Sequence, residues 1–407
     1  MNGSRNHQVV SGQFRLRVVM SMRGASVVGG RAIAALLACA VVLADASAQR
    51  VVTRADLAAA YMRLDRVVST TTVDDSARAT INRAFDRSTL SFFAGKFLAA
   101  VTTIDSLTVA LSGSALAAPP AAPTRLVKGK APSAARDAFL ARLAKVDSTG
   151  PLMQAVVSAR ARAALLVDVP SVDRSAEFLV DPARLAVDVE REVSALEKGR
   201  NPYARYAGDL WRSFRGANAS VIPYRIVASS SVATSRKPVP LMIVLHGAGG
   251  DENMFIDAYG AGITPTMAKT SGVLVVSPAT TAFGAAPENL DALLAQLHAE
   301  YNVDSSRVYV VGHSMGAGVS ARLAAQRPTV FAAAVCLAGG AVVKVDGAPP
   351  MLFVGAELDP LIPAKNVQAY AAATPTATYR LLPHEGHTLM VANGMRLAFP
   401  WMLERHR

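Results

Sequence analysis

The hydrophobic and polar positions along the chain divide it into two regions of different periodicity. From about residue 50 to 205, apolar residues recur at helical spacing, as Leu57, Tyr61 and Leu64 do. From about residue 208, short apolar runs alternate with amphipathic stretches. The first pattern predicts a set of helices, and the second predicts strands alternating with helices.

Six helices are predicted in the first region, and Thr53 is a suitable N-cap for the first of them. A proline-containing segment from Ser112 to Pro132 separates these helices into two groups. The predicted helices cover Arg54 to Val68 and residues 74–87, 90–111, 134–147, 151–167 and 182–198.

Several predicted strands of the second region are almost continuously apolar, as expected for parallel strands that helices cover on both faces. The predicted fold class is therefore α/β, with a mostly parallel, doubly wound sheet preceded by an all-helical N-terminal domain. The predicted strands are 222–228, 241–245, 273–277, 307–311, 333–337, 351–354 and 378–382. The predicted helices between them are 251–270, 287–301, 315–327 and 363–373.

The N-terminus has the pattern of an export signal. Arginines lead up to Arg31, an apolar stretch follows from Ala32 to Ala44, and Ala46-Ser47-Ala48 forms a small-x-small cleavage site. The apolar stretch is shorter than the roughly 20 residues that a membrane-spanning helix needs. We therefore expect a signal peptide over residues 1–48 and an exported protein, periplasmic or secreted, with no stable membrane span after cleavage.

Other interpretations of this segment remain open. It could stay attached as a membrane anchor, or it could be lipidated at Cys39, because residues 36–39 loosely resemble a lipoprotein signal. The apolar residues that continue past Cys39 argue against lipidation. The long segment before Arg23 suggests that translation begins at Met20 or Met22.

The formal net charge of +12 first suggests a nucleic-acid partner. The signal segment carries five arginines and one aspartate, so its removal leaves +8. The remaining basic residues are scattered among acidic ones, which is typical of a solvated surface, and we expect no nucleic-acid binding. Cys336 is the one cysteine outside the signal segment, and its apolar neighbours predict a buried packing residue.

The segment Gly312-His313-Ser314-Met315-Gly316 matches the G-x-S-x-G pattern of a nucleophile elbow. It follows a predicted strand directly and begins a predicted helix, which is the setting that such an elbow requires. The glycines permit a strained turn, and the start of the helix directs N–H groups toward developing negative charge. Ser314 is therefore the candidate nucleophile, and an idle serine in a glycine-rich turn is the alternative.

A serine hydroxyl needs a base to take its proton. Elimination among the seven histidines leaves His384 and His387, just after the last predicted strand. We favour His387 because Gly386 suits a loop that turns the ring toward the elbow, and His384 stays as the alternative. The elbow residue His313 is expected to pack or to form hydrogen bonds. The H-x-x-H pair lacks a third ligand nearby, so we expect no metal site.

The base in turn needs an acid that fixes its orientation. Asp359 follows a predicted strand and stands in a loop, and Glu357 and Asp346 are the alternatives. The order Ser314, Asp359, His387 is the nucleophile–acid–base order of α/β-hydrolases. Each of the three follows the carboxyl end of a predicted strand, where open parallel sheets bind ligands.

The glycine-rich segment from His246 to Gly250 follows another predicted strand. Its small residues let the backbone approach a substrate, so an N–H of Ala248 or Gly249, together with the N–H of Met315, is predicted to form an oxyanion hole. A flexible turn without function is the alternative.

Residues 208–407 resemble α/β-hydrolase esterases, a group that includes polyhydroxybutyrate depolymerase-like and feruloyl esterase-like proteins and the prolyl-oligopeptidase-type hydrolase domain. The resemblance implies a Ser314/Asp359/His387 triad that transfers an acyl group to water through an acyl-enzyme, without a cofactor. It leaves residues 50–205 unexplained. The segments that carry it are 223–225, 240–250, 301–309 into the elbow, 355–363 and 385–387.

We therefore expect a carboxylic-ester hydrolase that acts on small or polymeric esters. A serine peptidase of prolyl-oligopeptidase type and a non-catalytic binding protein on a relic hydrolase fold are the alternatives. The expected domains are the signal peptide 1–48, a helical domain 49–205 of unknown role and a catalytic domain 206–407. About a dozen residues join the strands that end at Leu337 and begin near Met351, which leaves no room for an inserted lid. One hypothesis is that the N-terminal helices cover the site instead.

Overall fold

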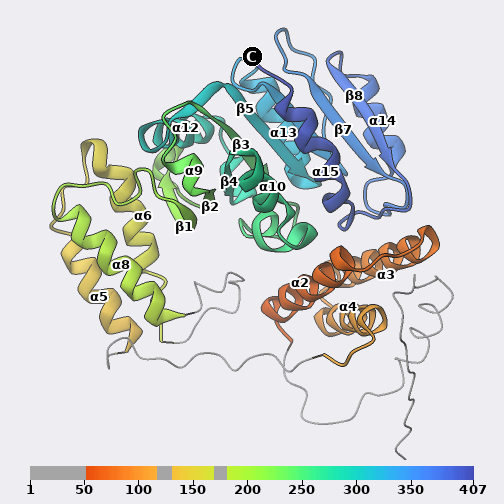
Figure 1. Cartoon of the computed structure of the whole chain (residues 1–407), viewed down its shortest axis with the longest axis horizontal. Helices are drawn as coiled ribbons and strands as arrows, with labels where there is room; N and C mark the ends of the chain where they lie inside the picture. The colour runs from red at the N-terminus through yellow and green to blue at the C-terminus, as the bar shows by residue number, and fades with distance from the viewer. Residues whose placement is uncertain (1–51, 117–130, 169–180) are drawn as a thin grey trace, which may run out of the picture.

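The structure is a computed structural model that describes residues 52–116, 131–168 and 181–407 (Figure 1). Its centre is an eight-stranded sheet with the order β1-β2-β4-β3-β5-β6-β7-β8. The strands from β3 to β8 run parallel, while β1 and β2 run antiparallel to their neighbours. The strands are β1 (Gly208–Arg215), β2 (Val221–Ala228), β3 (Val239–Leu245), β4 (Leu274–Pro278), β5 (Val303–His313), β6 (Ala333–Leu337), β7 (Met351–Ala356) and β8 (Ala377–Leu382).

Side chains of the central strands alternate between two hydrophobic cores, one on each face of the sheet. In β3, Leu241 and Ile243 belong to the first core, whereas Met242 and Val244 belong to the second. Successive side chains point to opposite faces of the sheet, and both faces are buried. The central strands are therefore apolar at every position. The first face is covered by α12 (Glu288–Glu300), α13 (Met315–Gln326) and α14 (Ala364–Ala372), and the second by α10 (Ile263–Ser271) and α15 (Met390–Leu403).

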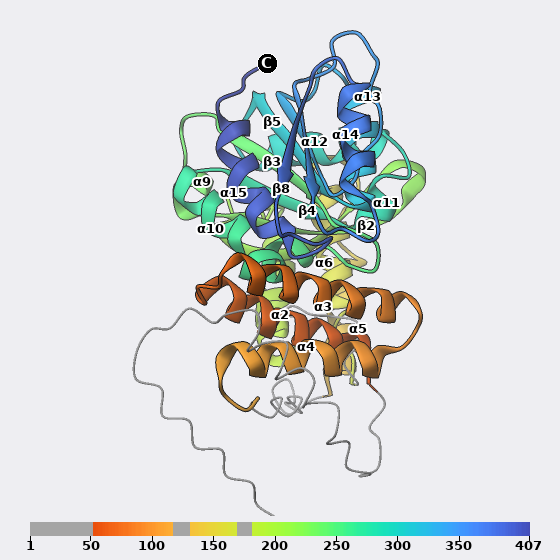
Figure 2. The ribbon, with the colours of Figure 1, turned by 90° about the vertical axis from the view of Figure 1, so that its right-hand side faces the viewer.

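The N-terminal helices form two groups, each of which shares a core with the sheet. The first group adds to the second core and lies across the edge where the parallel strands end (Figure 2). The second group adds to the first core and lies beside β1 (Figure 1). The first consists of α2 (Arg54–Thr70), α3 (Asp75–Phe93) and α4 (Phe97–Ser112), and the second of α5 (Pro132–Leu143), α6 (Met153–Ala163) and α8 (Pro182–Leu196).

Buried ion pairs connect the second group to the sheet. Arg162 of α6 lies 2.8 Å from Glu192 of α8, and its guanidinium also donates to the carbonyl of Trp211 in β1. Arg212 of β1 pairs with Glu300 at the end of α12. All four charged groups are almost completely buried, so each depends on its partner to offset the loss of hydration.

The predicted elements are mostly present, with a few corrections. The prediction placed a break between helices near residue 88, but α3 continues to Phe93, and Gly95 in the left-handed conformation makes the turn (φ 72°). The predicted helix 251–270 is divided into a π-helical turn (Met254–Ala258), a short 3₁₀ turn (Tyr259–Ala261) and α10, because Gly260 and Gly262 have positive φ.

Strand β1 and helix α15 were not predicted from the sequence. β1 reads as polar because it carries Asp209, Arg212 and Arg215, whose charges obscure its apolar positions. The expected signal peptide lies outside the described residues. Among the residues that the structure describes, no helix has the length and apolar character that crossing a membrane requires.

Candidate active site

Ser314 lies at a sharp turn between β5 and α13. Its backbone has φ 55° and ψ −116°, a conformation that non-glycine residues rarely adopt and that typically costs about 1–3 kcal/mol. Glycines on both sides make the turn possible. A Cβ on Gly312 would overlap the carbonyl of Gly316, and a Cβ on Gly316 would overlap the carbonyl of Leu245 at the end of β3. The turn therefore presents the Ser314 side chain at the carboxyl end of the sheet.

His387 lies between Ser314 and Asp359. Its Nε2 is 2.9 Å from Ser314 Oγ, and its Nδ1 is 2.7 Å from Asp359 Oδ2. The other carboxylate oxygen of Asp359 accepts the backbone N–H groups of Leu361 and Ile362, which fixes the carboxylate in the plane it needs. The structure thus brings together the three residues that the sequence suggested as nucleophile, base and acid, although they come from three separate strand ends.

The alternative residues lie elsewhere. His384 is partly exposed, and its ring faces Asp75 and Glu357 at 3.6 and 3.8 Å rather than Ser314. Glu357 accepts the backbone N–H of His384 at 2.7 Å. Asp346 is exposed in the loop between β6 and β7. Within the described ranges, no three His, Cys, Asp or Glu side chains come together as a metal site would require.

His313 connects the elbow to the loop that carries His387. Its Nε2 lies 2.8 Å from the carbonyl oxygen of His387, which can only accept, so Nε2 carries the proton. Nδ1 then accepts from the Tyr259 hydroxyl at 2.8 Å, and that hydroxyl oxygen accepts the N–H of Gly247 at 3.5 Å. Burial, together with the nearby His387, lowers the pKa of His313 well below its usual value. His313 therefore stays neutral. Its hydrogen bonds connect the elbow to the His387 loop and, through Tyr259, to the loop after β3.

The loop after β3 lies beside Ser314. Ala248 and Gly249 line the same pocket as Ser314, and Met315 is the first residue of α13, whose first turn has no side-chain cap. His246 holds the loop in shape, since its ring contacts the Gly247 carbonyl and accepts the N–H of Thr280. Ala248 and Gly249 thus share the pocket with Ser314, and Met315 follows it directly in the sequence. The role of these residues in an oxyanion hole stays a prediction.

Comparison with known proteins agrees with this geometry. Residues 250–380 match the family model described as serine aminopeptidase, S33. The chain is 31% identical over 170 residues to the putative esterase NocK of Nocardia uniformis subsp. tsuyamanensis, covering 37% of this chain and 49% of that protein. It is 32% identical over 148 residues to feruloyl esterase B of Neurospora crassa, covering 33% and 49%.

The mainly parallel sheet, the elbow after β5 and these relatives decide the classification. The C-terminal half is an α/β-hydrolase of the serine hydrolase type. A solved thermostable esterase is 25% identical, with a TM-score of 0.40 and coverage of 49% of this chain and 63% of that one. The chain spans about half the length of the curated relatives it matches.

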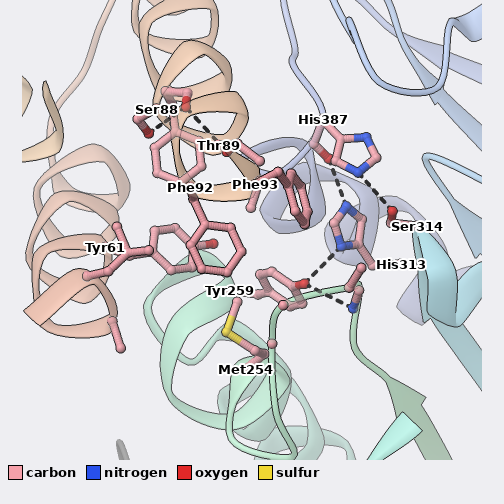
Figure 3. A pocket seen from close by; sticks show the side chains of 18 of the residues that line it. Tyr61, Ser88, Thr89, Phe92, Phe93, Met254, Tyr259, His313, Ser314 and His387 are labelled. Carbon is pink, nitrogen blue, oxygen red and sulfur yellow. Dashed lines mark hydrogen bonds between the residues drawn. The ribbon is translucent and has the colours of Figure 1, made fainter. Parts of the chain in front are cut away.

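A pocket of about 330 Å³ opens beside Ser314 in this hydrolase domain. One wall comes from the glycine-rich loop and the residues around Tyr259. The other wall comes from α2, α3 and α4, which contribute Leu57, Tyr61, Phe92 and Ile104 among others. Figure 3 shows the labelled side chains of α2 and α3 on the far side of the pocket from Ser314 and His387. The N-terminal helices thus cover the site of the hydrolase domain.

Helix α3 also contacts the loop that carries His387. Asp86 Oδ2 accepts the N–H of His387 at 2.9 Å, and Asn82 Oδ1 accepts the N–H of Gly386 at 2.8 Å. Asn82 Nδ2 donates to the carbonyl of His384 at 3.1 Å. A Cβ on Gly386 would overlap the Asp86 carboxylate, so the close approach of α3 requires a glycine there. Gly386 is not in the left-handed region, which differs from the turning role that the sequence suggested.

These residues of α3 were not predicted from the sequence. Arg78, Asn82 and Asp86 follow one another every four residues, and Arg78 forms an ion pair with the buried Glu385 at 2.7 Å. A polar stripe at this spacing is normally the solvated face of a helix. Its burial here depends on residues about 300 positions later in the chain, so no local pattern could have indicated it.

Proposed function

We propose that this chain hydrolyses carboxylic esters through an acyl-enzyme on Ser314. The observation that carries the proposal is the hydrogen-bonded series from Ser314 Oγ through His387 to Asp359, placed on a strained elbow beside a largely apolar pocket. In the first step, His387 Nε2 takes the hydroxyl proton while Oγ attacks the ester carbonyl. Asp359 stabilises the imidazolium that forms.

The negative charge of the tetrahedral intermediate develops on the former carbonyl oxygen. The N–H of Met315 and an N–H of the loop at Ala248 or Gly249 are the donors proposed to bind it. The ester C–O bond then breaks, and the alcohol leaves with the proton from His387. Water attacks the acyl-enzyme by the same route, which releases the carboxylic acid and restores the Ser314 hydroxyl.

A serine aminopeptidase is the second candidate, because the matching family model carries that description. An aminopeptidase needs an ionised carboxylate to bind the substrate amine. Among the described residues that line the pocket, Asp251 is the one carboxylic acid. One of its carboxylate oxygens already accepts the N–H of Asn253 at 2.9 Å. These contacts, and the two relatives named as esterases, support ester hydrolysis over peptide hydrolysis.

The test compares p-nitrophenyl esters with aminoacyl p-nitroanilides, using the full chain and Ser314→Ala. We expect ester turnover that falls by several orders of magnitude in Ser314→Ala, and labelling of Ser314 by a fluorophosphonate in the unsubstituted chain. Equal ester turnover by both proteins would disprove the assignment of the nucleophile. Faster turnover of the anilides than of the esters would instead favour the peptidase.

We also propose that the protein is exported, on the basis of the N-terminal pattern alone. Expression with the native N-terminus, followed by cell fractionation and intact-mass measurement, tests this proposal. A mature chain that begins at Gln49 and is found outside the cytoplasm is the expected result. A lipid-modified Cys39 or a retained N-terminus would contradict the expected cleavage site.

A further inference from the structure

Helices α2, α3 and α4 form one wall of the pocket beside Ser314. We propose that these helices form a binding site for one uncharged, apolar substituent of the ester, of limited size. This inference rests on the proposed ester hydrolysis and adds the substrate class. The relatives match the C-terminal half, so the helices that form this wall lie outside the matched region.

The side chains on the helical wall are mainly hydrocarbon. Two of its hydroxyl groups are engaged within α3 itself: Ser88 Oγ donates to the Phe85 carbonyl at 2.6 Å, and Thr89 Oγ1 donates to the same oxygen at 3.3 Å (Figure 3). These hydroxyls therefore offer little to a polar substrate group. The other residues of the wall are Leu57, Ala58, Phe85, Phe92, Phe93 and Ile104, together with Tyr61, whose ring ends in a hydroxyl group.

The charges around the pocket exclude ionic substituents. No lysine or arginine occurs among the described residues that line it, so a carboxylate or phosphate on the substrate would be buried without a partner. Asp251 is the acidic residue of the lining, and one of its carboxylate oxygens already accepts the N–H of Asn253 at 2.9 Å, which leaves less of the carboxylate available to a cation. A neutral hydrocarbon or aromatic group avoids both costs.

The volume of about 330 Å³ sets an upper limit on the size of the group. This lies at the lower end of the range for small-molecule sites, roughly 300–1,000 Å³. Within that limit, each added CH₂ that enters the pocket should raise kcat/KM about fourfold. A longer chain has to leave through the mouth, where the half-exposed Phe93 lies, and gains no further burial.

Two series of esters test the inference with the full chain. In one, the acyl chain lengthens from acetate to dodecanoate at a fixed p-nitrophenyl alcohol. In the other, the alcohol lengthens at a fixed acetyl group. We expect one series to show a rise in kcat/KM with chain length followed by a plateau or a decline. A flat profile in both series would overturn the inference.

Substitutions in α2 connect the chain-length profile to the wall. Ala58→Phe should move the optimum of the chain-length profile to shorter chains, because its larger side chain occupies part of the pocket volume. Ala59→Phe, one residue on and outside the lining, is the matched control. If Ala58→Phe does not fold, Leu57→Ala should move the optimum to longer chains. An unchanged optimum in the folded variant overturns the inference.

The two proposals fail in different ways. Acetate turnover that depends on Ser314 but shows no chain-length preference leaves the ester hydrolase intact and rejects the binding site. Absence of ester turnover and of Ser314 labelling in the full chain rejects the hydrolase, and the binding site with it.

The hydrogen bonds from α3 carry a second, independent inference. We propose that Asp86 and Asn82 are positioning residues that hold the His387 loop against the elbow. Asp86 accepts a hydrogen bond from the N–H of His387, and Asn82 accepts one from the N–H of Gly386. The His387 backbone is thus fixed from two sides, by Asp86 at its N–H and by His313 at its carbonyl.

Burial of the Asp86 carboxyl lowers the stability of the fold, so its presence suggests that the hydrogen bond to His387 is needed for function. It is 2% exposed, and burial raises its pKa to about 6. Its Oδ1 has no hydrogen-bond partner within the part of the chain that the structure describes. A carboxylate held in this way is unfavourable for stability, and its contacts are to the backbone of the proposed base and of the next residue, Thr388.

Kinetics of Asp86 variants test the positioning role. Asp86→Ala removes the acceptor, and we expect kcat for a short ester to fall about 10- to 100-fold with KM within about twofold, because a small displacement of His387 misaligns proton transfer. Asp86→Asn keeps an oxygen for the His387 N–H and should retain kcat within about threefold. Arg87→Ala, at the next and exposed position of α3, is the control.

Two results would overturn the positioning role. One is a kcat of Asp86→Ala equal to that of the unsubstituted chain. The other is Asp86→Asn as slow as Asp86→Ala, which would show that the hydrogen bond is not what matters. If Asp86→Ala does not fold, Gly386→Ala replaces it. That variant moves the loop away from α3 and should lower kcat to a similar extent with KM unchanged.

Discussion

The Asp86 carboxylate and the backbone N–H of His387 lie 2.9 Å apart, although 301 positions separate them in the sequence. Through this contact and the pocket wall, the first group of N-terminal helices takes part in the site instead of merely preceding it. The second group has a different position, beside β1 and away from Ser314. The two groups should therefore respond differently to substitution.

The first prediction distinguishes the two candidate histidines. His387→Ala should lower kcat by several orders of magnitude, because Ser314 Oγ loses the nitrogen that lies 2.9 Å from it. His384→Ala should stay within a few-fold of the unsubstituted chain, since its ring faces Asp75 and Glu357. Steady-state kinetics with a short p-nitrophenyl ester measure both. A comparable loss in the two variants would contradict the role assigned to His387.

The second prediction compares two glycines of α13. Gly316→Ala should lose activity by at least about 100-fold or fail to fold, because its Cβ would overlap the Leu245 carbonyl. The Cβ of Gly318→Ala meets no atom closer than Arg322 Nη1 at 3.7 Å. This variant should be active and up to about 1 kcal/mol more stable, because alanine favours a helix. Urea unfolding and ester turnover together provide the measurement.

The third prediction concerns Asp65 of α2, which is 3% exposed and accepts the N–H of Ala261 at 3.0 Å. Burial raises its pKa to about 6, with Arg78 and Arg396 acting in the opposite direction. The folded state therefore binds this proton more tightly than the unfolded state, so the contribution of Asp65 to stability falls as pH rises from about 4 to 6.

Asp65→Asn removes that titration. Its free energy of unfolding should rise relative to the unsubstituted chain across the same interval and level off near 3 kcal/mol above about pH 6. Denaturant unfolding at several pH values measures the difference. The exposed Asp346, substituted in the same way, controls for the change in net charge. A difference that is the same at pH 4 and pH 7 would be inconsistent with the raised pKa.

The fourth prediction concerns the second helical group. Glu192→Gln removes the buried carboxylate that lies 2.8 Å from Arg162 and leaves only the more distant Asp188 at 3.8 Å, so it should lower the free energy of unfolding by about 3 kcal/mol. The chain-length profile and KM of the folded fraction should not change, because α6 and α8 lie outside the pocket lining. A shifted substrate preference in this variant would show that the second group influences the site after all.

Local patterns were sufficient for the elements that carry the site. The apolar strands, the elbow at Ser314 and the strand ends before Asp359 and His387 were predicted because each depends on a few adjacent residues. Thr53 likewise caps α2, and its side chain and that of Asp56 exchange hydrogen bonds with the backbone as in a capping box. The family resemblance over the C-terminal half is confirmed.

These local patterns could not predict contacts between segments that are distant in the sequence. Arg212 reads as a solvated residue, yet it is buried against Glu300, and so β1 was missed. Asn82 and Asp86 read as a polar helix face, yet they bind the His387 loop. In each case the partner that makes burial of a polar group possible lies far away in the sequence. The hypothesis that the N-terminal helices cover the site agrees with the pocket lining.

The contact between α3 and the His387 loop also bears on the order in which the proposed site is assembled during synthesis of the chain. The helices that wall the pocket emerge long before the strand and loop that complete it. Contact between them closes a loop of about 300 residues. This step is slow, because the chain loses conformational entropy before the contacts between α3 and the His387 loop stabilise it. A chain whose synthesis has reached Ser314 but not residue 387 therefore lacks the proposed base, so on the proposed mechanism ester hydrolysis begins only after this late contact has formed.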